Sequence, residues 1–109
     1  MATVSIKNTY LDMLTAIGRV DLIVEEAVRK YLIDKYVERL EKAKRKIREF
    51  AERYSCDYPD FNLRLSDERR LAKIEKEHPT WEADKAEWVY WQKELEEWKA
   101  KLEDILMKS

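Results

Sequence analysis

The residue types that most often perform chemistry are scarce in this chain. Its 109 residues include one histidine, one cysteine and one glycine. Glu75 and His78 have the Glu-x-x-His spacing found in di-iron helical bundles, but the chain holds no second copy of that motif. One His and one Cys also cannot supply the four ligands of an ordinary structural zinc site. We therefore expect no bound metal and no cofactor.

Catalytic motifs are missing as well. The common phosphate-binding loops need several glycines. Ser5, Ser66 and Cys56 have no histidine near them in sequence that would act as a general base. We predict that the protein is not an enzyme. Cys56 cannot form an internal disulfide, and no run approaches the ~20 apolar residues of a membrane span. No signal-peptide core is present either, so we expect a cytoplasmic protein without membrane contact.

The chemistry that the sequence does indicate lies near its start. Residues 3–7 alternate polar and apolar side chains, the pattern of a β-strand. Val4 and Ile6 then face the interior, while Thr3, Ser5 and Lys7 point outwards. Hydroxyl and ammonium groups suit the donor and acceptor edges of bases in the DNA major groove. Thr3, Ser5 and Lys7 are therefore candidate DNA-binding residues.

A lone strand of five residues predicts a second chain. Its backbone donors and acceptors need partners, and no hairpin signal such as Asn-Gly occurs. Residues 61–65 alternate like a strand but also fit one helical face, and we favour a short helical turn there. Residues 3–7 then pair with their own copy, which predicts a homodimer with a two-stranded antiparallel ribbon.

The rest of the sequence predicts helices. A short helix ends at Ile17, and Gly18 is placed to close it in a left-handed turn. A long helix then runs to about residue 54, short helices cover 59–77, and a last helix covers 80–107. The long helix and the last helix both carry apolar residues at 3-4 spacing, so we expect them to pack as an antiparallel helical hairpin. The chain thus divides into a head of residues 1–32 and an extension of residues 33–109.

The last helix has more apolar residues than one contact buries. Trp88, Val89, Tyr90 and Trp91 are consecutive and cover most of the helix circumference. Either a third helix from residues 67–77 covers them, or they bind a dimer mate or another protein, so they are candidate partner-binding residues. Asp84, the one charged residue in the stripe, either fixes the register or lies where the stripe opens to water.

Residues 2–32 resemble the ribbon-helix-helix DNA-binding proteins, many of which are repressors or antitoxins. The resemblance rests on residues 3–7, the short helix, the turn at Gly18, and Ala27-Val28-Arg29-Lys30-Tyr31-Leu32. It implies an obligate dimer with its ribbon in the major groove, and we expect Arg19 on the DNA backbone. Residues 55–109, with His78-Pro79-Thr80-Trp81, resemble the tails of prokaryotic antitoxins, which typically bind a toxin.

The sequence therefore predicts a mainly α-helical protein with one short N-terminal β-strand. We expect a transcriptional regulator that binds operator DNA, represses its own operon as an antitoxin, and neutralises a protein toxin through its extension. The alternative is a helical protein–protein interaction module that dimerises without specific DNA binding.

Overall fold

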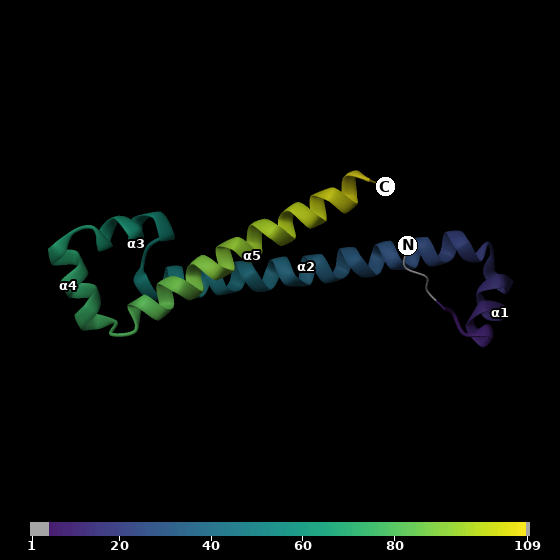
Figure 1. The fold of residues 1–109 in the computed structure, drawn as a ribbon, viewed down its shortest axis with the longest axis horizontal. Coiled ribbons are helices and arrows are strands. Elements are labelled where there is room, and N and C mark those ends of the chain that lie inside the picture. Colours follow the sequence, from purple (N-terminus) through teal and green to yellow (C-terminus); the bar gives the residue numbers. More distant parts are fainter. Residues whose placement is uncertain (1–4, 109) are drawn as a thin grey trace. The chain divides into compact units, whose positions relative to one another are not determined.

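The computed structural model describes residues 5–108, and all regular structure in this range is helical. Figure 1 shows the helices in chain order. They are α1 (Asn8–Ile17), α2 (Val20–Tyr54), α3 (Tyr58–Leu65), α4 (Glu68–Glu77) and α5 (Trp81–Met107). The chain forms two compact units, one up to residue 35 and one from residue 36 onwards. Residues 20–35 of α2 belong to the first unit and residues 36–54 to the second.

The predicted N-terminal strand is wrong. Thr3 and Val4 lie outside the described residues, and Ser5–Lys7 forms no strand. Lys7 is instead the residue before α1, and its carbonyl oxygen accepts a hydrogen bond from the amide of Leu11 at 3.0 Å. A carbonyl that a β-ladder would use is thus the first acceptor of a helix. Only two apolar residues supported the alternation, and strand preference depends on packing partners. The ribbon-helix-helix fold class is therefore wrong too, since residues 5–108 contain no β-ribbon.

The left-handed turn expected at Gly18 is also absent. Gly18 has a φ of 170°, an extended conformation that any residue adopts. A Cβ added there would meet Ile23 Cδ1 at 3.8 Å, an ordinary contact. Within residues 5–108, the non-glycine residue with a positive φ is Ser55, at 55°, directly after α2.

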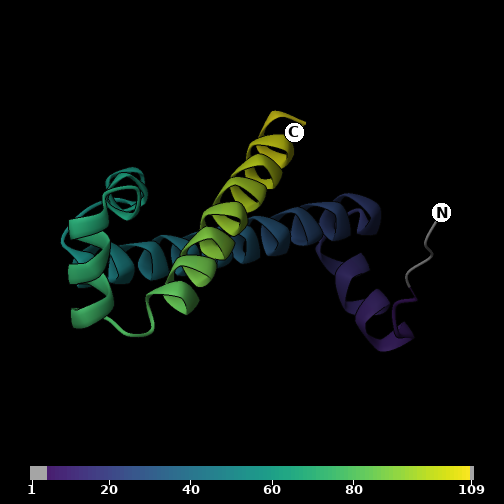
Figure 2. The same cartoon turned by 60° about the vertical axis from the view of Figure 1, so that its left-hand side comes forward.

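In the second unit, α5 packs antiparallel against residues 36–54 of α2 and crosses them at an angle, so that its C-terminal part diverges from them (Figures 1 and 2). Aromatic contacts fix the antiparallel direction. Near the end of α2, the rings of Phe50 and Trp88 lie 5.8 Å apart, and further back the rings of Tyr36 and Trp98 lie 5.7 Å apart. Asp84 is buried between the same two helices.

The core of the second unit is aromatic. It consists of five buried residues from four helices: Phe50, Tyr54, Phe61, Ile74 and Trp88. Trp88 and Phe61 are completely buried, with ring centroids 5.3 Å apart. Because α3 provides Phe61, this short helix covers the end of the α2–α5 pair and is part of the same core.

Two aspartates start the short helices of the second unit. The carboxylate of Asp57 accepts a hydrogen bond from the amide of Asp60 at 3.0 Å, which caps α3. Asp67 accepts from the amides of Arg69 and Arg70 at 3.0 and 3.2 Å, which caps α4. Caps of this kind satisfy backbone donors that the first helical turn leaves free, and each stabilises by about 1 kcal/mol.

Replacing the central indole tests this description of the core. Trp88→Ala removes a fully buried ring, so we expect the free energy of unfolding to fall by about 3–5 kcal/mol. Tyr90→Ala, two residues along the same helix, removes a ring that is 52% exposed, and its cost should stay below about 1 kcal/mol. Urea unfolding followed by circular dichroism measures both. Equal losses for the two variants would contradict a core centred on Trp88.

Candidate functional site

The first unit exposes a large apolar surface. In residues 5–35 no residue is buried, although the helices are rich in aliphatic and aromatic side chains. Ile17 is 78% exposed, and Met13 and Tyr31 are each 61% exposed. We call the exposed set the N-terminal apolar face. Its members are Tyr10, Leu11, Met13, Ile17, Leu22, Val28 and Tyr31.

Helical spacing groups much of this apolar surface into stripes. On α1, Tyr10, Met13 and Ile17 follow at intervals of three and four residues, so they share one side of the helix. On α2, Val28 and Tyr31 are three residues apart and share a side in the same way. Stripes of this kind normally pack against another helix.

The charges of this unit balance. Residues 5–35 contain five basic and five acidic side chains. The bases are Lys7, Arg19, Arg29, Lys30 and Lys35, and the acids are Asp12, Asp21, Glu25, Glu26 and Asp34. A neutral surface with mixed charges is not repelled by a copy of itself.

The predicted DNA-binding residues do not form one described surface. Thr3 lies outside the described residues, while Ser5 and Lys7 are exposed in the segment before α1. Arg19 lies between α1 and α2 and forms an ion pair with Asp21 at 2.7 Å. Its guanidinium is thus partly neutralised where we predicted a contact with the DNA backbone. The DNA-binding and antitoxin roles stay predictions.

The four predicted partner-binding residues of α5 divide by burial. Trp88 is completely buried under α2 and α3 of its own chain, so its side chain is not available to a partner. Val89 and Trp91 are partly buried, and Lys42 of α2 lies 5.6 Å from the centre of the Trp91 ring. Tyr90 is the member that faces solvent.

Asp84 lies in a buried polar cluster. It is 8% exposed, and its Oδ2 accepts a hydrogen bond from the hydroxyl of Tyr54 at 2.5 Å. The same oxygen lies 3.0 Å from the guanidinium of Arg53. Both partners come from the end of α2, so a shift of α5 would leave the carboxylate buried without them. This geometry favours the register-fixing interpretation of Asp84.

The cluster makes stability depend on pH. Burial, and then the hydrogen bond to Asp84, raise the pKa of Tyr54 above its ordinary value. The folded protein then keeps the phenolic proton at a pH where the unfolded chain has lost it. This contribution to stability is full below about pH 10 and falls at higher pH, by up to about 1.4 kcal/mol per pH unit.

We expect the free energy of unfolding of the wild type to fall more steeply between pH 9.5 and 11 than that of Tyr54→Phe. Urea unfolding over this range measures both, and other groups contribute equally to the two proteins. Parallel pH profiles would contradict the buried, hydrogen-bonded state of the Tyr54 hydroxyl.

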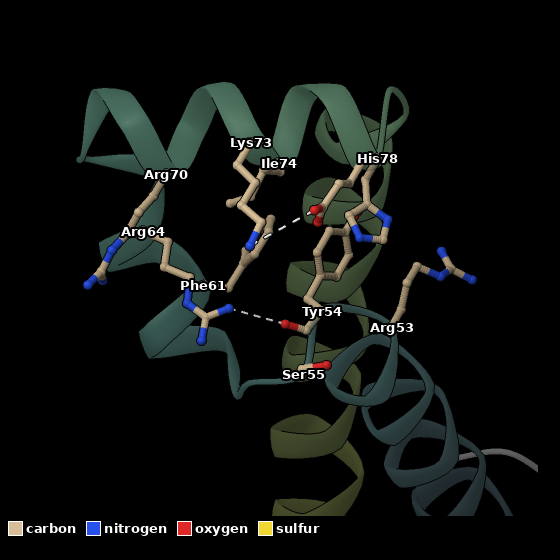
Figure 3. A pocket seen from close by; sticks show the side chains of 10 residues that line it. Arg53, Tyr54, Ser55, Phe61, Arg64, Arg70, Lys73, Ile74 and His78 are labelled. Atoms are coloured by element: carbon tan, nitrogen blue, oxygen red, sulfur yellow. Dashed lines mark hydrogen bonds and ion pairs between the residues drawn. The ribbon is translucent and has the colours of Figure 1, made fainter.

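A cavity of about 490 Å³ lies at the same end of the second unit, between the end of α2, α3 and α4 (Figure 3). Buried side chains of Tyr54, Phe61 and Ile74 form its base. The remaining lining residues are polar or charged, and most of them are basic: Arg53, Ser55, Arg64, Arg70, Lys73, Glu77 and His78. We call this space the basic cavity.

Sequence reasoning missed the basic cavity. Its available signal was the basic side chains at positions 70 and 73 of α4, three residues apart and therefore on one side of the helix. The contribution of Arg64 from α3 depends on the packing of the two helices, which spacing alone does not show.

Within residues 5–108, no group of three or more His, Cys, Asp or Glu side chains is arranged to hold a metal ion. In the same range no helix combines the length and apolarity needed to cross a membrane.

No family model, curated protein or solved structure matches this chain. The case for a function therefore depends on the geometry of the described residues.

Proposed function

We propose that this protein is a helical protein–protein interaction module that works as a homodimer through its N-terminal apolar face. The observation that carries the proposal is that residues 5–35 form two helical segments in which no side chain is fully buried and apolar residues such as Leu14, Ile23 and Leu32 are only partly buried. A helix of ten residues such as α1 is marginal in water on its own, and most helical stability comes from packing an apolar side.

The size of the face supports an interface. At their observed exposures, its seven side chains offer on the order of 700 Å², against the ~800 Å² that each partner buries in a standard interface. One partner covers part of this area, because Leu22 and Tyr31 are nine residues apart and lie on opposite sides of α2. Patches of more than a few hundred Å² on a soluble protein usually mark interaction sites.

A second copy of this chain is the occupant that the charges favour. Five bases and five acids are interspersed on residues 5–35, so two copies bring no net charge together. A twofold contact would also let the α1 stripe of each protomer cover apolar side chains of the other. An acidic or basic partner would find no complementary excess of charge here.

Two matched charge substitutions test the dimer. Ile17→Glu places a carboxylate at the most exposed member of the face, and burying it without a partner is unfavourable. We expect at least about tenfold weaker self-association. Leu63→Glu is the control, because Leu63 is 67% exposed but lies on α3 in the second unit. Sedimentation equilibrium at micromolar concentrations measures both against the wild type.

Folding can be followed separately from assembly. All four tryptophans lie in the second unit, so their fluorescence reports the fold of residues 36–108 in every variant. We expect unchanged fluorescence in Ile17→Glu together with a shift to the monomer mass. A monomeric wild type, or equal association of Ile17→Glu and Leu63→Glu, would overturn the homodimer. If the wild type is a monomer, the N-terminal apolar face would instead bind a different protein.

A further inference from the structure

The basic cavity has more positive charge than its own acids neutralise. Arg53 is paired with Asp84 at 3.0 Å, and Lys73 lies 4.0 Å from Glu77. Among residues 5–108, the side chains of Arg64 and Arg70 have no carboxylate within ion-pair distance. The cavity therefore has an excess of about two positive charges, in a chain whose formal net charge is -1.

Much of this charge is available to a ligand. Arg64 uses one N–H to donate to the carbonyl oxygen of Tyr54 at 3.3 Å, which fixes the guanidinium beside the cavity and leaves its other donors free. Figure 3 shows Lys73 and Arg64 reaching from α4 and α3 towards the space beside Phe61. Lys73 is exposed, and its contact with Glu77 is long and solvated, so it holds the ammonium weakly.

The lining matches a phosphate group better than a carboxylate. Guanidinium and ammonium donors from two helices suit a tetrahedral anion with several oxygens, and Arg binds phosphate through two parallel hydrogen bonds. A phosphomonoester carries about -1.5 to -2 charges at neutral pH, close to the local excess. The cavity volume of about 490 Å³ falls within the ~300–1,000 Å³ of small-ligand sites. It therefore has room for part of the group that carries the phosphate.

We propose that the basic cavity binds a phosphomonoester, with Arg64 and Lys73 holding its oxygens. Arg70 adds positive charge at the rim, where its guanidinium points away from the other two side chains (Figure 3). The phosphate belongs either to a small molecule or to a phosphorylated side chain of a protein. The site lies entirely within the second unit, and the proposal does not depend on dimerisation through the N-terminal apolar face.

Calorimetric titration of the full chain with O-phosphoserine, at constant ionic strength, tests the site. The double variant Arg70→Gln with Lys73→Gln should bind at least about tenfold more weakly than the wild type. The matched control is Arg69→Gln with Lys76→Gln, which removes the same charges from α4 at positions that do not line the cavity. Its affinity should stay within about twofold of the wild type.

Glu77 gives a test in the opposite direction. Its carboxylate lines the cavity and repels an anion, so Glu77→Gln should bind O-phosphoserine severalfold more tightly. General loss of fold or loss of surface charge would not produce this gain.

Two further ligands identify the source of the phosphate. A phosphoserine peptide that binds more tightly than O-phosphoserine indicates a phosphorylated protein, and equal affinities indicate a small molecule. The same peptide with glutamate in place of phosphoserine should bind at least about tenfold more weakly. Equal binding of that peptide would overturn the phosphate assignment. No saturable binding to the wild type, or equal weakening by the two double variants, would overturn the site itself.

Discussion

Trp88 is completely buried, and its ring lies 5.3–6.0 Å from four other aromatic rings. Two of these rings come from the end of α2, and two come from α3. This one side chain of α5 therefore fixes where α3 packs against the pair of long helices. The position of α3, with α4 directly after it, then brings Arg64 to the side of the basic cavity. The cavity is thus a consequence of the aromatic core.

Tyr54 connects the core to both polar features of the second unit. Its ring packs on Phe61, its hydroxyl donates to Asp84, and its carbonyl oxygen accepts from Arg64. Hydrogen bonds in a buried setting depend on direction as well as distance, whereas aromatic packing tolerates small shifts. The combination explains how a core of flat rings can still specify one arrangement of helices.

The two units differ in how much of their structure the sequence pattern could predict. The apolar stripes of α2 and α5 repeat over many turns. The structure pairs residues of the two stripes: Tyr36 contacts Trp98, and Phe50 contacts Trp88. Residues 3–7 offered one short alternation of polar and apolar side chains. The helix that begins after Lys7 shows that so short a pattern does not determine the secondary structure. The hydrogen bond between Tyr54 and Asp84 was not predictable, because it joins two helices that are distant in sequence. The meeting of Arg64 with α4 depends on the angle at which two consecutive helices pack, which residue spacing does not give.

Gly18 has a thermodynamic consequence for assembly. Its backbone conformation is one that any residue adopts, and a Cβ there would have room. The glycine therefore contributes conformational entropy to the connection between α1 and α2 without being needed for its shape. Any partner that orders α1 must offset this entropy, which is worth about 0.4–1 kcal/mol relative to alanine. If α1 forms the proposed interface, the single glycine of the chain makes that association weaker, and more readily reversible, than the same surface on a stiffer connection.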